Sequence, residues 1–250
     1  MDAETLIWIV ASGAATGIGG LLLLLVRAPS PRTLDTLLGF TGGVMLGATA
    51  FSLLVPALDR GGIAEITAGF AVGCLFLVLL DELAPHEHER FSERGRQVGT
   101  GRTPRARARL LLTALTVHNI PEGLAVGLAF GAGGTELGVP LAVAIGVQNI
   151  PEGFAAGAPL LDAGRGRRFA AGVAALTGAV EPPAALAAYA AVETFEPLLP
   201  FAFGFAAGAM LYVVVDELIP ESHGHGFERE ASIALLAGFA LLLVLDNSLG

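Results

Sequence analysis

The chain has 250 residues, of which 54% are hydrophobic and only 15% are charged. This composition is too apolar for an ordinary soluble globular domain and indicates a protein that lies mostly in lipid. A single cysteine, Cys74, excludes an internal disulfide framework and a cysteine-rich zinc module, and at a net charge of −9 no nucleic-acid partner is expected.

Eight apolar stretches follow one another along the chain, and each is long enough for a membrane-spanning helix, which takes roughly 20 residues. The first, Leu6 to Val26, is too long for the core of a signal peptide and has no basic segment before it, so we expect it to be retained. We therefore predict an all-α, polytopic integral membrane protein with one transmembrane domain over residues 1–250. The predicted spans are 5–26, 34–58, 63–84, 108–131, 138–160, 168–192, 198–220 and 229–247.

The arginines predict how these spans are oriented. With the N-terminus outside, 13 of the 14 basic residues fall in inner loops and Arg60 alone falls outside, as the positive-inside rule favours. Both termini are therefore expected on the outer side of a cell membrane. The segment 87–109 is rich in arginine and glycine without apolar periodicity, so we predict a disordered cytoplasmic loop there.

One six-residue segment occurs twice with a single change. Residues 118–123 read His-Asn-Ile-Pro-Glu-Gly, and residues 148–153, 30 positions later, read Gln-Asn-Ile-Pro-Glu-Gly. They lie in the fourth and fifth spans, which cross in opposite directions. A weaker similarity relates residues 43–56 to residues 208–220, in the oppositely directed second and seventh spans. The pattern predicts an inverted repeat of three, two and three helices, with the substrate site at the repeat interface near the middle of the bilayer.

The repeated segment carries groups that bind metals. On a helix, His118 and Glu122 are one turn apart and share a face, and Asn119 flanks them. Pro121 and Pro151 lack an amide hydrogen, so each is expected to kink and break its helix. The glycine two positions after each proline is expected to let a neighbouring backbone approach closely.

Carboxylates in the middle of a membrane need a compensating charge. Burying Glu122 or Glu152 there costs at least about 2.5 kcal/mol on insertion scales, and Glu181 in the sixth span adds a third carboxylate. A divalent cation fits this set of oxygen and nitrogen ligands, either as one ion or as two ions bridged by the glutamates. The ligand types suit Zn, Cd, Fe or Mn as cargo, and no catalytic cofactor is expected. The predicted metal ligands are His118, Asn119, Glu122, Gln148, Asn149, Glu152 and Glu181.

Further polar residues lie at the ends of the predicted spans and in the loops. Carboxylates and histidines on the inner side predict an exit path for the metal, and polar residues on the outer side predict an entrance that attracts cations. Solvated helix ends and loops are the alternative for both groups. The predicted exit residues are Asp81, Glu82, His86, His88, Asp216, Glu217, His223 and His225, and the predicted entrance residues are Met45, Ser52, Asp59 and Asp246.

Three alternatives use the same residues. A lone histidine or glutamate in a span often pairs with a neighbouring helix, but two copies on adjacent spans favour a metal site. A membrane metalloenzyme would use Glu122 or Glu152 as a general base, yet the His-Glu-x-x-His and Gly-x-Ser-x-Gly motifs are missing, so no enzyme is expected. A passive cation channel would share the ligands and differ in a flux that does not saturate.

Segments 118–123 and 148–153 resemble the paired motif of the ZIP (Zrt- and Irt-like) family of divalent metal transporters, above all its prokaryotic branch. The resemblance covers essentially the whole chain. It implies eight transmembrane helices with both ends outside, often a homodimer, metal transport into the cytoplasm by alternating access, and a binuclear centre on the fourth, fifth and sixth spans. It also implies that His118, Glu122, Gln148 and Glu152 hold one metal, and that Asn119, Asn149 and Glu181 hold a second together with the shared glutamates.

The resemblance also bears on individual positions. It implies that Met45 and Ser52 line the outer approach. Many family members carry histidine at the position of Gln148, some carry aspartate at that of Asn149, and some carry histidine at that of Asp216. Neutral amides bind a divalent ion more weakly than imidazole or carboxylate groups, so the second metal position is the weaker one in this chain.

Overall fold

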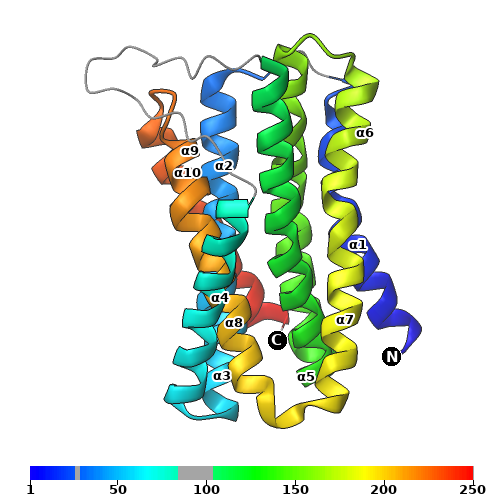
Figure 1. Ribbon diagram of the computed structural model, residues 1–250, viewed down its shortest axis with the longest axis vertical. Coiled ribbons are helices and arrows are strands. Elements are labelled where there is room, and N and C mark those ends of the chain that lie inside the picture. Colours follow the sequence, from blue (N-terminus) through cyan, green and yellow to red (C-terminus); the bar gives the residue numbers. More distant parts are fainter. Residues whose placement is uncertain (26–28, 84–103, 250) are drawn as a thin grey trace.

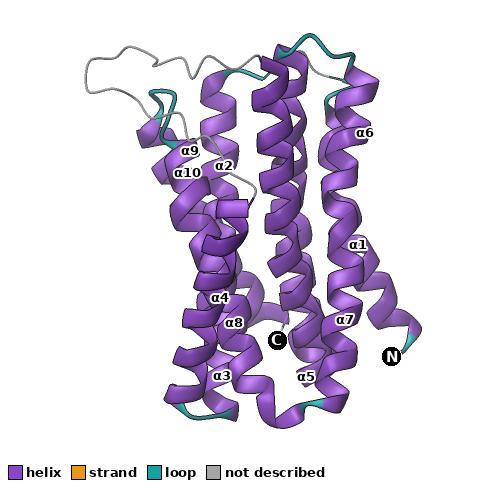
Figure 2. Cartoon of the chain, viewed as in Figure 1, coloured by secondary structure: helices purple, strands orange, loops and turns teal. Residues whose placement is uncertain are grey.

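The computed structural model describes residues 1–25, 29–83 and 104–249 (Figure 1). Within these ranges every regular element is a helix and no strand is present (Figure 2). The predicted all-α architecture is therefore confirmed. The long helices run roughly along the long axis of the molecule, as expected if they share one membrane (Figure 1).

Capping residues set where the first two long helices begin. α1 (Ala3–Leu22) follows Asp2, whose side chain accepts a hydrogen bond from the amide of Thr5 at 2.8 Å. This bond lowers the pKa of the exposed Asp2 carboxyl, because it stabilises the charged form. α2 (Pro31–Gly47) is capped in the same way by Ser30.

Two helices widen into a π-helix shortly before a proline, at Pro56 and at Pro220. Proline has no amide hydrogen and its ring crowds the carbonyl four residues earlier, so ordinary α-helical bonding is interrupted there. Both positions belong to the weakly similar segments 43–56 and 208–220, so that similarity has a structural counterpart. The first composite helix is α2, η1 (Ala48–Leu54) and α3 (Val55–Arg60), and the second is α8 (Leu199–Val213), η4 (Val214–Leu218) and α9 (Ile219–Ser222).

The long element α5 (Pro104–Asp162) contains both copies of the repeated segment. Its backbone stays helical at Pro121 and Pro151, and within α5 only Gly134 leaves the helical region, with φ 59° and ψ −142°. The prediction that each repeated segment is a broken helix is therefore wrong. The missing amide hydrogens of these prolines, and of Pro140 and Pro159 in the same element, do not end the helix, whereas the positive φ at Gly134 redirects the chain.

The chain folds back on itself at Gly134. A Cβ atom on Gly138 would lie 2.2 Å from the ring of Phe130, eight residues earlier, which requires the two halves of α5 to run side by side. Figure 1 draws both halves in green. We call residues 104–133 the first arm and residues 135–162 the second arm.

The helices pack as two groups. In the first group α1, α6 and α7 pack with α5, and in the second group α4 packs on α8 while α10 packs on α2. α5 makes most of the contacts between the groups, chiefly with α2 and α8. The remaining elements are α4 (Ile63–Leu83), α6 (Arg167–Thr177), η2 (Gly178–Val180), α7 (Glu181–Thr194), η3 (Glu196–Leu198) and α10 (Glu228–Leu249).

Glycines bring the helices within each group into close contact. A Cβ atom on Gly127 of α5 would lie 2.0 Å from the carbonyl oxygen of Ala185 in α7. One on Gly43 of α2 would lie 1.9 Å from that of Leu235 in α10. No side chain fits at these positions, so the backbones themselves are in contact, as is common between helices in lipid.

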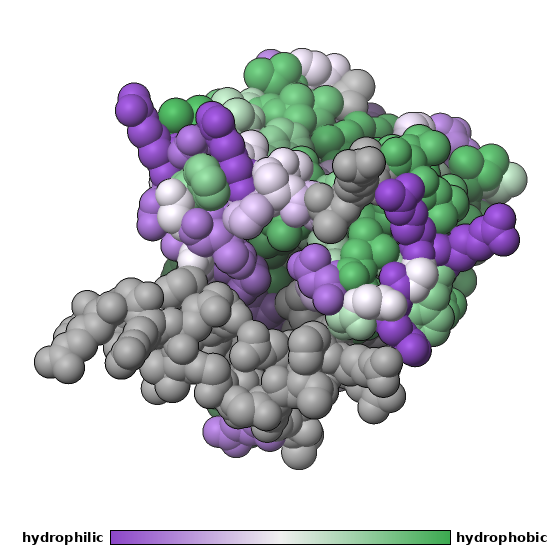
Figure 3. All heavy atoms as spheres, turned by 90° about the horizontal axis from the view of Figure 1, so that it is seen from above, coloured by the Kyte–Doolittle hydropathy of each residue, from purple (hydrophilic) through white to green (hydrophobic). Residues whose placement is uncertain are grey.

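Seven helical stretches of the described residues are long and apolar enough to cross a membrane. One of them, Thr116–Asp162, contains the reversal at Gly134 and overlaps both the fourth and the fifth predicted spans, so the count of eight crossings stays a prediction. Large hydrophobic side chains are exposed along α1, α4 and α10, as expected of helix surfaces that face lipid. Hydrophilic residues project from the end that Figure 3 shows from above.

The observed helix bounds lie within a few residues of the predicted spans. α5 begins at Pro104, so residues 104–109 of the predicted cytoplasmic loop are helical. Residues 84–103, with His86 and His88, lie outside the described residues.

Candidate metal site

The seven predicted metal ligands are all buried. None has more than 3% of its surface exposed, although each carries a polar or charged side chain. His118, Asn119 and Glu122 come from the first arm of α5, and the residues of the second copy come from the second arm. Glu181 is the first residue of α7, directly after the short turn η2.

The glycine of each repeated segment places its arm against another backbone. A Cβ atom on Gly123 would lie 2.4 Å from the carbonyl oxygen of Glu181, and one on Gly153 would lie 2.0 Å from that of Thr16 in α1. The close approach predicted from the sequence is therefore present at both glycines. It seats the start of α7 on the first arm and α1 on the second arm.

Glu181 is surrounded by hydrogen-bond donors. Asn149 Nδ2 lies 2.9 Å from Glu181 Oε1 and 2.8 Å from Oε2. Asn119 Nδ2 lies 3.4 Å from Oε1, and the hydroxyl of Thr16 donates to the same oxygen at 3.2 Å. These bonds join the two arms, α1 and α7 around one carboxylate, and they stabilise its charged form.

Glu122 and Glu152 lack such donors. All four of their carboxylate oxygens are buried, and no described residue donates a hydrogen bond to them. The Gln148 side chain interacts with both carboxylates, and its Nε2 atom donates a hydrogen bond to Asn149 Oδ1 at 2.6 Å. Glu122 also lies within electrostatic reach of Glu152 and Glu181, so three carboxyl groups share one buried region, where a cation would stabilise their ionised forms.

His118 contacts the second group of helices. Its Nε2 lies 2.6 Å from Oε1 of Glu217 in η4. Glu217 is largely buried and was predicted as part of the exit path, and the structure places it directly against a predicted ligand. The pair joins the first arm to the π-helical stretch that precedes Pro220.

The acidic and imidazole groups of the seven predicted ligands do not form a preorganised metal site. Among the described residues, no three His, Cys, Asp or Glu side chains converge closely enough to hold a metal ion together. Glu181 is bonded to Asn149, and His118 lies against Glu217. Binding an ion among them requires these pairs to loosen, so that the lone pairs turn toward a common centre.

The predicted entrance residues are only partly brought together. The Ser52 hydroxyl in η1 donates to Asp246 Oδ1 in α10 at 3.0 Å. Met45 is buried in the core, and Asp59 is exposed near the end of α3. The sequence had indicated these four residues one by one, and the structure joins two of them.

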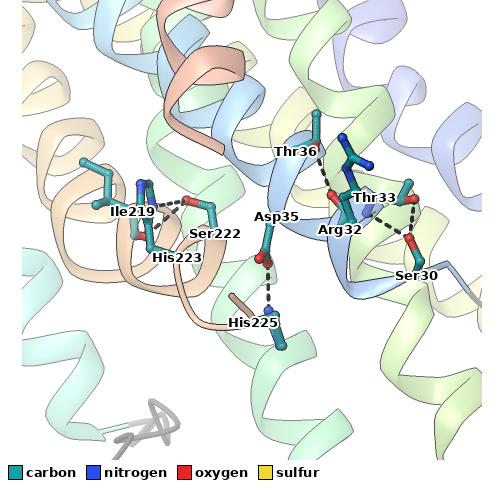
Figure 4. Close-up of polar contacts among 9 residues, drawn as sticks. All are labelled: Ser30, Arg32, Thr33, Asp35, Thr36, Ile219, Ser222, His223 and His225. Atoms are coloured by element: carbon teal, nitrogen blue, oxygen red, sulfur yellow. Dashed lines mark hydrogen bonds and ion pairs between the residues drawn. The ribbon is translucent and has the colours of Figure 1, made fainter. Parts of the chain in front are cut away.

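The predicted exit residues lie in several places. Glu82 is exposed in the last turn of α4, where Asp81 also lies, and Asp216 is partly buried beside Glu217 in η4. His223 and His225 lie in the loop between α9 and α10. His225 pairs with a residue that the sequence did not single out, Asp35 of α2 (Figure 4).

Several polar residues near the site escaped the sequence analysis. Ser12 accepts a hydrogen bond from Asn149 Nδ2 through its carbonyl oxygen at 3.0 Å, and the Thr41 hydroxyl donates to the Gln148 carbonyl at 3.4 Å. Thr16 was missed as well, and so was Asp35, which lies outside this cluster. Small hydroxyl residues are common in membrane helices, so nothing in the sequence marked these, although a charged residue such as Asp35 at the edge of a span is a usable signal.

Apolar helices around a buried set of carboxylate, imidazole and amide groups define a multi-pass membrane protein with an interior suited to cations. A family model described as ZIP Zinc transporter matches residues 84–246. The chain is 44% identical over 248 residues to the zinc transporter GufA of Myxococcus xanthus, which covers 96% of both chains. It is 40% identical over 249 residues to the zinc transporter ZIPB of Bordetella bronchiseptica, covering 96% of this chain and 79% of that relative.

A human relative extends the comparison beyond bacteria. The chain is 33% identical to the zinc transporter ZIP11 of Homo sapiens over an alignment of 321 positions, which covers 94% of both chains. The chain therefore belongs to the ZIP zinc transporter family, which confirms the resemblance of its two repeated segments.

Proposed function

We propose that this protein carries divalent transition-metal cations, zinc foremost and Cd, Fe or Mn as further cargo, across a cell membrane into the cytoplasm. The observation that carries the proposal is the buried pair Glu122 and Glu152, whose oxygens receive no hydrogen bond from the described residues. Two buried carboxylates without donors form a strong attraction for a doubly charged ion. The relatives GufA and ZIPB are named as zinc transporters, which supports the same cargo.

The ligand types divide the cluster into a stronger and a weaker metal position. His118, Glu122, Gln148 and Glu152 combine an imidazole and two carboxylates with one amide, which suits zinc. Asn119, Asn149 and Glu181 add one carboxylate and two amides, and in the structure the amides donate to that carboxylate. We therefore expect the first position to bind more tightly, with the second filled at higher metal concentration.

Alternating access is supported by the division into two groups of helices. The ligands belong to the first group, and the contacts with the second group run mostly through α5. A shift of one group against the other would expose the cluster to each side of the membrane in turn. The distribution of arginines supports the orientation with both termini outside.

The test is uptake of radioactive zinc into proteoliposomes that contain the full chain. Natural protein should give saturable uptake, and Glu122→Gln and Glu152→Gln should each reduce it to the level of empty liposomes, because one charge of the pair is lost while the shape stays. Glu136→Gln is the matched control, since Glu136 is an exposed glutamate on the same element, α5. Undiminished uptake by both site variants would refute the proposal, and uptake that rises linearly with zinc would favour a channel.

A further inference from the structure

Asp35 is a fully buried carboxylate outside the metal cluster. It lies one turn into α2 and has 0% of its surface exposed. Its Oδ1 atom lies 2.7 Å from Nδ1 of His225 (Figure 4). Its Oδ2 atom is also buried, and no described residue donates a hydrogen bond to it. Burying a carboxylate with a single partner is unfavourable in free energy, so a second positive charge near Asp35 would stabilise it.

Among the described residues, no other basic group near Asp35 supplies this second positive charge. Arg32, three positions earlier on α2, directs its guanidinium to Glu230 of α10 at 3.3 Å. The neighbouring His223 makes its contacts with Ile219, Ser222 and Ser232. In this part of the structure His225 is thus the one basic group paired with Asp35.

The pairing fixes the chemistry of the His225 ring. An ionised carboxylate only accepts hydrogen bonds, so Nδ1 carries the hydrogen and Nε2 of the neutral ring keeps its lone pair. No described residue bonds to that Nε2 atom, and 30% of the side chain is exposed. A histidine whose Nδ1 hydrogen is held by a carboxylate is the usual arrangement behind a metal-binding Nε2 atom.

His223, two positions away, provides the contrast. Its Nδ1 lies 2.9 Å from the carbonyl oxygen of Ile219, and its Nε2 lies 3.0 Å from the hydroxyl of Ser232. Both ring nitrogens are occupied, so this imidazole has no lone pair to offer. Of these two histidines, only His225 is prepared to bind a ligand.

We propose that Asp35 and His225 form a second binding site for a divalent transition-metal cation at the end of the molecule where α2 begins. His225 supplies Nε2 as the ligand, and Asp35 is a positioning residue that orients the ring through Oδ1 and contributes negative charge. One imidazole completed by water makes a weak site, which suits an ion that must leave again. The identity of the cargo rests on the proposed function, and the predicted orientation puts this site on the cytoplasmic side.

The experiment is a zinc-binding titration of the purified full chain in detergent, in a background of Glu122→Gln and Glu152→Gln that weakens the central cluster. The background protein should retain one weak binding step. Adding His225→Gln should remove that step, and adding Asp35→Asn should weaken it by about 10-fold or more, the usual effect of losing such an orienting partner. His223→Gln is the matched control and should leave the step unchanged.

Three results would overturn the assignment: no residual step in the background, a step that survives His225→Gln, or an equal loss with His223→Gln. Because His225 is partly exposed, its variant is expected to fold, and size-exclusion profiles check both variants. A failure of the proposed function is seen separately, as normal zinc uptake by the single variants Glu122→Gln and Glu152→Gln.

Discussion

At the scale of single residues, Asn149 organises the buried cluster of predicted metal ligands. Its Nδ2 lies within hydrogen-bonding distance of both Glu181 oxygens and of the Ser12 carbonyl, while its Oδ1 accepts from Gln148. Every polar atom of this amide is therefore in use. Asn149 holds the acidic residue of α7 in place, and it would reach a metal only by giving up some of these bonds.

We predict that Asn149→Asp makes the metal-free protein less stable than the natural protein. We also predict that zinc raises the Tm of the variant by more than it raises the Tm of the natural protein. The new carboxylate would lie about 3 Å from Glu181 and repel it. The hydrogen bonds that the amide donated would also be lost, which lowers the free energy of unfolding by roughly 1–3 kcal/mol and the Tm by a few degrees. With zinc bound, the two carboxylates become better ligands than the amide. Thermal unfolding in detergent, with EDTA and with zinc, measures both effects.

The control for this variant is Asn247→Asp, the same change at an exposed residue of α10. This variant should have the Tm of the natural protein both with EDTA and with zinc. If zinc raised the Tm of Asn149→Asp no more than that of the natural protein, residue 149 would not lie close enough to the bound metal to coordinate it.

At the scale of elements, glycines fix the distance between helices and therefore the position of the predicted ligands. α7 begins with Glu181 and lies against the first arm of α5 at Gly123 and Gly127. The carbonyl oxygen of Ala185 would be only 2.0 Å from a Cβ atom on Gly127. A backbone carbonyl in a helix cannot turn aside, so any side chain at this position displaces α7 and its carboxylate.

We expect Gly127→Ala to lower both the stability and the zinc affinity of the protein. Overpacking of this kind costs typically about 1–3 kcal/mol. A lower Tm in detergent, together with a weaker zinc-induced rise in Tm, would show that α7 has moved with Glu181.

Gly172→Ala provides the comparison, because nothing lies within 4 Å of a Cβ atom at Gly172 of α6. Alanine stabilises a helix relative to glycine by up to about 1 kcal/mol, so this variant should be as stable as the natural protein or slightly more so. Equal losses in the two variants would mean that the close approach at Gly127 has no special role.

At the scale of the whole molecule, Arg60 links the two groups of helices at one end. Its guanidinium donates to the Pro56 carbonyl at 3.0 Å and to the Ala132 carbonyl at 3.5 Å. It also lies 5.9 Å from the centre of the Phe203 ring. Pro56 and Phe203 belong to the second group, and Ala132 belongs to the first arm of α5. The Arg60 guanidinium therefore bridges carbonyl groups near the ends of two helices.

We predict that Arg60→Gln lets the two groups separate more often at this end. Spin labels at Ala64 on α4 and Thr135 on α5, with Cys74 replaced by serine, report that separation as a distribution of distances. The distribution should broaden toward longer distances in the variant, because a contact present in one conformation and absent in the other shifts the balance between them.

Arg167→Gln is the appropriate control, since the Arg167 guanidinium lies 3.4 Å from the Leu24 carbonyl within the first group. Its distance distribution should match that of the natural protein. Identical distributions in all three proteins would show that Arg60 does not hold the groups together.

The sequence by itself determined the helical membrane architecture, the approximate spans, the repeated polar segments and the close approach at Gly123 and Gly153. These features depend on hydropathy and on spacing along one helix, both of which are local and readable. Only the tertiary structure decided which side chains meet. The pairs Asn149–Glu181, His118–Glu217 and Asp35–His225 join residues 32, 99 and 190 positions apart. Helical periodicity indicates which face of a helix is polar, but which helix lies opposite that face depends on the packing of the whole chain.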